Sequence, residues 1–277
     1  MKKALLLALL LTLTACAAPP EEEPVAETFA PIPQEAPARY LGIAAVARIN
    51  RSMHATLDFP GRARTEVTFA AVLVDSGGVI RACTVDGVDA ALLFDAAGHL
   101  QTPNGTVFPS KTALGDRYGM HKASALGTEW YQQAAAFAAH CVGKTADELQ
   151  TADTVTSVTV STDCLLRAVT EAAENARTAA PPETDTLTLT CRAVAEGSRS
   201  AAADSPGAAR IRITAMARTP DGTESACALF SALPFSAAGR LTCDLSQSLS
   251  PLSDVLYPTA ILPTDYDAFG EILAQTG

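Results

Sequence analysis

Aromatic and charged residues are both scarce in this sequence. Aromatics make up 5% of the 277 residues, with a single Trp, and charged residues make up 18%. Lys and Arg number 20 against 30 Asp and Glu, which gives a formal net charge of −10. Nucleic acid requires a positive protein surface, so this balance argues against it as a partner. The 48% of apolar residues still suffices for a packed core and excludes a wholly disordered chain.

Several motifs that carry chemistry are also missing. The sequence has no Cys-x-x-Cys pair, no Gly-rich phosphate loop and no Gly-x-Ser-x-Gly nucleophile elbow. His54, His99, His121 and His140 are scattered, without the paired spacing of metal ligands, so we expect no metal site. A hydrolase has no visible nucleophile and base. These absences leave open whether the chain is an enzyme at all.

The N-terminus predicts export. Two lysines at positions 2–3 precede an apolar run over residues 4–13, which is too short to span a bilayer. The run ends in Leu-Thr-Ala-Cys at Cys16, which resembles the lipobox of bacterial lipoproteins. The resemblance implies a signal peptide over residues 1–15, a diacylglyceryl thioether on Cys16, and an extracytoplasmic chain anchored to the bacterial membrane by lipid.

Residues 16–38 are expected to form an extended tether. Prolines recur along this segment, and three consecutive glutamates stand at positions 21–23. Proline removes backbone hydrogen-bond donors, and neighbouring glutamates repel one another. The tether would hold the folded part away from the membrane surface.

The remaining sequence predicts an α+β fold, with an antiparallel sheet of hairpins packed by two or three helices over residues 39–180. Strands alternate with Gly-containing turns, and apolar residues then recur at helical spacing from Trp130 to Cys141, with Gly143 as a stop. The expected strands are 41–49, 67–74, 79–85 and 92–94, and the expected helices are 130–141, 146–150 and a segment with its apolar face from Leu165 to Ala176.

Residues 181–277 are expected to form a truncated, mostly β repeat of the same unit. Residues 92–100 and 233–241 share six identities in nine, and strands at 187–195 and 211–217 take the places of the first two strands. The alternative is two unrelated hairpins that share a common turn pattern.

A segment from Asp153 to Ser161 precedes the last predicted helix. It resembles the motif of the FMN-binding domain family: Asp, a small residue, any residue, Ser or Thr, Gly, Ala, Thr, then a helix. Asp153 and Thr156 match, and Thr159 matches the final Thr. In that family a separate flavin transferase joins this Thr to FMN through a phosphodiester. The resemblance implies Thr159 as the attachment site, and it covers roughly residues 41–179.

Two positions depart from the motif, and two hypotheses follow. The family's Gly falls on Ser157 and its Ala on Val158, which removes backbone freedom and adds bulk. By resemblance, the chain is a flavin carrier that relays electrons to a redox partner outside the membrane. The alternative is a non-enzymatic binding or scaffold lipoprotein of the cell envelope with a degenerate flavin motif, in which these hydroxyl residues form only a strand edge and a helix cap.

Other side chains are weaker candidates. Lys111 or Arg117 could meet a phosphate if their segment lines a pocket, although such a segment is more often an ordered surface loop. Trp130 and Tyr131 could stack on a flavin ring or pack in the core. Six cysteines besides Cys16 allow disulfides in an exported chain, and we expect at most one or two, with no pairing assigned.

Overall fold

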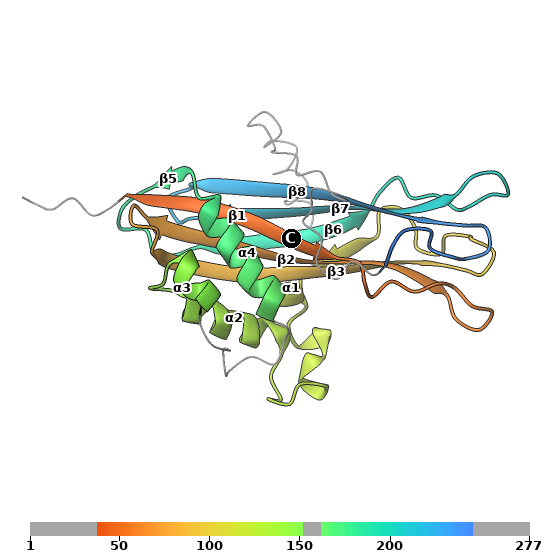
Figure 1. Cartoon of the computed structure of the whole chain (residues 1–277), viewed down its shortest axis with the longest axis horizontal. Coiled ribbons are helices and arrows are strands. Elements are labelled where there is room, and N and C mark those ends of the chain that lie inside the picture. The colour runs from red at the N-terminus through yellow and green to blue at the C-terminus, as the bar shows by residue number, and fades with distance from the viewer. Residues whose placement is uncertain (1–37, 152–161, 246–277) are drawn as a thin grey trace, which may run out of the picture. The chain divides into compact units, whose positions relative to one another are not determined.

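The computed structural model describes residues 38–151 and 162–245 (Figure 1). These residues form two four-stranded antiparallel sheets together with helices, which confirms the α+β class. The signal peptide, most of the tether and the segment around Thr159 lie outside the described residues, as does the C-terminal tail after residue 245. Among the described helices, none has the length and apolarity needed to cross a bilayer.

Sheet 1 has the strand order β3-β2-β1-β5. Its strands are β1 (Arg39–Arg48), β2 (Gly61–Asp75), β3 (Ile80–Phe94) and β5 (Thr178–Ala180). The predicted hairpin at residues 76–78 is present, and the Asp75 carboxylate accepts hydrogen bonds from two backbone N–H groups of this turn. The strands predicted at 79–85 and 92–94 are one continuous strand, because β2 pairs with β3 along its whole length.

Sheet 2 has the strand order β4-β6-β7-β8. Its strands are β4 (Val107–Pro109), β6 (Thr188–Ala195), β7 (Gly207–Arg218) and β8 (Glu224–Phe235). The two predicted strands at 187–195 and 211–217 correspond to β6 and β7. The short strand β4 was not predicted, and it joins sheet 2 although it follows sheet 1 in the chain.

Helices follow β4 and precede β5. They are α1 (Lys111–Leu114), two 3₁₀ turns at Gly115–Tyr118 and Met120–Lys122, α2 (Trp130–Cys141), α3 (Ala146–Thr151) and α4 (Thr162–Glu174). The expected apolar faces of α2 and α4 are buried. A capping box between Glu129 and Gln132 begins α2. The helices predicted from periodicity are therefore confirmed.

The two sheets share one apolar core, and the helices cover the other face of sheet 1 (Figure 1). Helices α2 and α4 pack on this face. The approach of α4 to β1 requires Gly42, since a Cβ there would lie 2.0 Å from the Ala172 carbonyl oxygen. The described residues thus form three layers: helices, sheet 1 and sheet 2.

The hairpins β2–β3 and β7–β8 have the same local contacts at one end. Gly61 lies against the ring of Phe94, and Gly207 lies against the ring of Phe235 in the same way. The two rings stack on each other with centroids 4.3 Å apart. Two reciprocal backbone hydrogen bonds of 2.8 Å join the flanking loops: Ala55 N to Gly239 O and Ala201 N to Gly98 O. The internal duplication itself stays a prediction.

Candidate functional site

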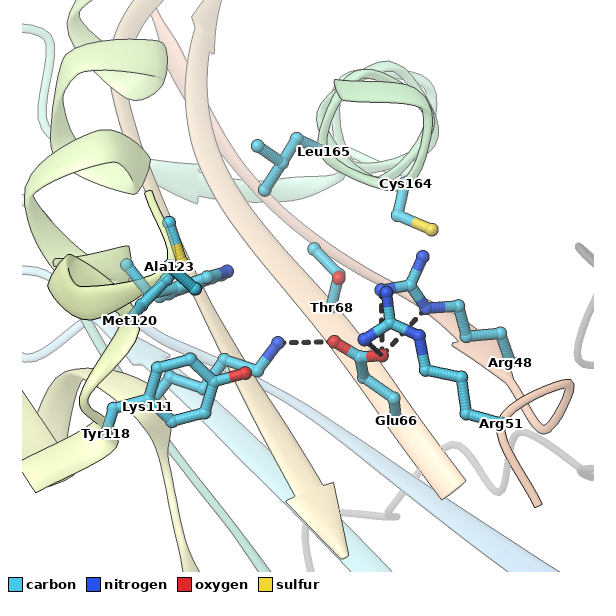
Figure 2. A pocket seen from close by; sticks show the side chains of 11 residues that line it. Arg48, Arg51, Glu66, Thr68, Lys111, Tyr118, Met120, Ala123, Cys164 and Leu165 are labelled. Carbon is cyan, nitrogen blue, oxygen red and sulfur yellow. Dashed lines mark hydrogen bonds and ion pairs between the residues drawn. The ribbon is translucent and has the colours of Figure 1, made fainter. Parts of the chain in front are cut away.

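A cavity of about 460 Å³ opens on the helix-covered face of sheet 1 (Figure 2). Strands β1 and β2 form its floor, the segment from α1 to Ala123 forms one wall, and the first turn of α4 forms another. Its volume is within the range of small-molecule sites. The lining residues are Arg48, Arg51, Glu66, Thr68, Lys111, Tyr118, Met120, Ala123, Trp130, Cys164 and Leu165.

Glu66 is the central charged group of the cavity. It lies on β2 directly opposite Arg48 on β1, and its side chain is 5% exposed. Its Oε1 accepts a hydrogen bond from Lys111 Nζ at 2.5 Å, and its Oε2 accepts one from Arg48 Nε at 2.8 Å. Arg51 adds a third cation, with Nη1 3.8 Å from Oε2. One buried carboxylate therefore faces three cations.

Lys111 is held in place by the short helix that it begins. The Ser110 side chain caps this helix by accepting the N–H of Ala113 at 3.1 Å. The Lys111 ammonium lies 4.9 Å from the ring centroid of Trp130 and 5.4 Å from that of Tyr118. A buried ammonium is stabilised by the negative faces of such rings as well as by a carboxylate.

The surrounding cations keep Glu66 ionised. Burial alone raises the pKa of its carboxyl group, but Lys111 and Arg48 lower it further than burial raises it, to about 2. With Glu66 charged, the lining residues still carry two more positive charges than negative ones. This local excess contrasts with the net charge of −10 of the whole chain. The cavity therefore favours an anion, and Tyr118, Trp130 and Met120 add an apolar wall.

The residues of the predicted flavin motif precede α4 in the sequence. Asp153, Thr156, Ser157, Val158 and Thr159 all lie outside the described residues, and so does Cys16. The described chain resumes with the first turn of α4, of which Cys164 and Leu165 line the cavity.

The two weaker cation candidates, Lys111 and Arg117, have different surroundings in the structure. Lys111 lines the cavity, whereas Arg117 does not and instead donates hydrogen bonds to the carbonyl oxygens of Leu114 and Ala113. The stretch around them is therefore partly a pocket wall and partly an ordered surface segment.

The two aromatic candidates, Trp130 and Tyr131, line different cavities. Trp130 is 5% exposed, so it belongs to the core and also lines the cavity. Tyr131 faces a second cavity of about 380 Å³, and its hydroxyl donates to Asp116 Oδ1 at 3.3 Å.

Sequence reasoning missed Glu66, Arg48 and Arg51. A polar stripe on β2 was the available signal, because Arg64, Glu66 and Thr68 alternate with residues of the opposite face. In residues 38–151 and 162–245, no group of three or more His, Cys, Asp and Glu side chains comes together as a metal site. The six cysteines in these ranges are free thiols.

No protein-family model matches the chain, and neither a curated protein sequence nor a solved structure matches it. The residues of the cavity and the sequence pattern before α4 are therefore what indicates a function.

Proposed function

We propose that this chain is a lipid-anchored extracytoplasmic lipoprotein that carries FMN, attached through Thr159. The observation that supports the proposal most is the cation-rich cavity beside the first turn of α4, since the flavin-like motif directly precedes this helix. Thr159 is five residues before Cys164, a stretch of at most roughly 17 Å even when fully extended. The cavity is thus within reach of a group attached at Thr159.

The residues of the cavity fit the chemistry of FMN. A phosphodiester is an anion, and the excess of Arg48, Arg51 and Lys111 over Glu66 would bind it through charge-assisted hydrogen bonds. Tyr118 and Trp130 would contact the apolar ring system. When bound, the flavin supplies reversible electron transfer, while the protein positions it and adjusts its potential. The chain would then relay electrons between a redox partner and another acceptor without a substrate of its own.

The test is to express the full chain in a bacterium together with a flavin transferase and purify it from membranes. We expect visible flavin absorbance and the added mass of FMN on the tryptic peptide 145–167, localised to Thr159 by fragmentation. Thr159→Val should abolish both signals, whereas Ser161→Ala, which removes a neighbouring hydroxyl outside the motif, should retain them. A colourless protein of unmodified mass would contradict the proposal.

The second candidate is a non-enzymatic binding or scaffold lipoprotein of the envelope. Ser157 and Val158, which replace the family's Gly and Ala, favour it. The direct contact of Lys111 with Glu66 also favours it, because a satisfied buried ion pair serves the fold without any ligand. In that case the chain stays colourless, and its modified mass reflects only the lipid on Cys16.

A further inference from the structure

Two cysteines lie against each other on the helix-covered face of sheet 1. Cys83 is on β3, and Cys141 is the last residue of α2. Cys141 belongs to the apolar cluster that joins α2 and α4 to this sheet, and Cys83 packs against that cluster. Their thiols form a hydrogen bond with each other. Two side chains from distant parts of the sequence are therefore already in contact.

Backbone hydrogen bonds fix the two chain segments that carry these thiols. Gly143, two residues after Cys141, donates its N–H to the carbonyl of Ile80 at 2.8 Å. Ile80, three residues before Cys83, donates its N–H to the carbonyl of Lys144 at 2.9 Å. The end of α2 is thus fastened to the start of β3. A disulfide needs two cysteines held at short range in this way, because larger separations require backbone movement.

Cys83 is the accessible member of the pair, because Cys141 is fully buried. Cys83 is partly exposed and lines the second cavity, so a small disulfide can reach it. The hydrogen bond from Cys83 and the nearby Lys144 ammonium hold the pKa of the Cys141 thiol below its usual value. The same hydrogen bond raises the pKa of the Cys83 thiol. A lowered pKa favours the thiolate, which is the nucleophile in thiol–disulfide exchange, so Cys141 is suited to attack the Cys83 sulfur once the oxidant is attached there.

We propose that Cys83 and Cys141 form a disulfide that fastens α2 to sheet 1 when the chain meets an oxidising compartment. The S–S bond forms as both thiols lose their protons, and the pair gives two electrons to a disulfide oxidant. The oxidant's own S–S bond breaks, and the oxidant leaves as two thiols. This inference does not depend on FMN, and disulfides are typical of proteins outside the cytoplasm.

The first test is a peptide map of the full chain purified from membranes and treated with oxidised glutathione. Free thiols are alkylated under denaturing conditions without reduction before digestion with trypsin. Cys83 and Cys141 fall in the peptides 82–111 and 123–144, each of which holds one cysteine. We expect a linked pair of these peptides, lighter by two hydrogen atoms than their sum. Alkylation of both cysteines, or linkage of either to another cysteine, overturns the proposal.

The second test compares melting temperatures with and without reductant. The bond closes the long loop of residues 83–141, so the oxidised chain should melt about 10 °C above the reduced chain. Cys83→Ser and Cys141→Ser should each remove this difference. Cys227→Ser is the control, because Cys227 lies on β8 and packs against the core between the two sheets, away from α2, and the difference should remain. If either single variant retains the full difference, the bond does not join these two residues.

Discussion

In each sheet, three residues that are neighbours across adjacent strands form a row at a corresponding position, and these residues differ between the two sheets. In sheet 1, register places Arg48, Glu66 and Asp89 side by side on β1, β2 and β3. In sheet 2, Val194, Arg212 and Phe230 stand side by side on β6, β7 and β8. The rows correspond because Glu66 and Arg212 each lie five residues after the glycine that contacts a stacked phenylalanine.

The surroundings of the two rows explain the difference. Helices cover the row of sheet 1, and Glu66 is only 4% exposed there. In sheet 2, Phe230 is 48% exposed, and Arg212 pairs with a Glu196 side chain that is 54% exposed. Burial of a charge is costly unless partners surround it, so a charged cluster under helices requires several cations around one carboxylate. Sheet 1, which carries the candidate site, therefore differs from sheet 2 in the helices that cover it and not in the arrangement of its long strands.

The largest expected effect concerns the two charged residues at the matching positions. Glu66→Gln leaves Lys111 and Arg48 without their carboxylate partner in a buried site, which should lower the free energy of unfolding by about 3–5 kcal/mol. Arg212→Gln breaks an exposed pair and should cost less than about 1 kcal/mol. Denaturant unfolding of both variants measures the contrast, and equal losses would refute the distinction between the two rows.

A somewhat smaller effect is expected from pH. The pKa of Glu66 falls from 4.5 to about 2 in the folded chain, so its stabilisation is fully present above pH 4.5. As pH falls toward 2, about 3 kcal/mol of stability should be lost. The difference in unfolding free energy between the unaltered chain and Glu66→Gln, measured along the pH scale, isolates this contribution. A difference that stays constant from neutral pH to pH 2 contradicts it.

The smallest effect is expected at the two hairpin turns, where the two halves of the molecule should behave alike. Gly78 and Gly222 stand in the β2–β3 and β7–β8 turns with φ of 78° and 92°, and a Cβ would meet no atom within 4 Å at either position. Gly78→Ala and Gly222→Ala should therefore each cost only the conformational strain of a left-handed residue, about 1 kcal/mol. Thermal unfolding compares the two. A several-fold larger cost in one turn would show that the hairpins differ in more than their outer faces.

Sequence periodicity predicted most of the strands and helices because their apolar residues repeat with the local geometry. It divided β3 in two because Asp86 and Asp89 interrupt the apolar pattern. In the structure Asp86 Oδ1 accepts the N–H groups of Gly87 and Thr112, and Asp89 accepts a hydrogen bond from Arg64, so both carboxylates are satisfied within the strand. Of these partners, Thr112 and Arg64 are distant in sequence, and a local pattern does not reveal them.

The candidate site was predicted only in part. Lys111 was singled out because its segment mixes glycine, aromatic and charged residues. Glu66 and Arg48 were not, because a charge within a strand is usually read as facing solvent. Whether that face is buried depends on α2 and α4, which follow much later in the chain. The positions of these helices on the sheet are a long-range property that single-sequence patterns do not contain.

The short strand β4 has a practical consequence for dividing the chain. It lies between β3 and α1 in sequence but pairs with β6, so a truncation after Ala180 would remove its partner strand. The same cut would uncover the inner face of sheet 1, including Phe69 and Phe94, which are fully buried here. An exposed apolar face with unpaired edges promotes aggregation. Recombinant fragments that end at the proline pair 181–182 should therefore precipitate, and shortened versions should keep both sheets together.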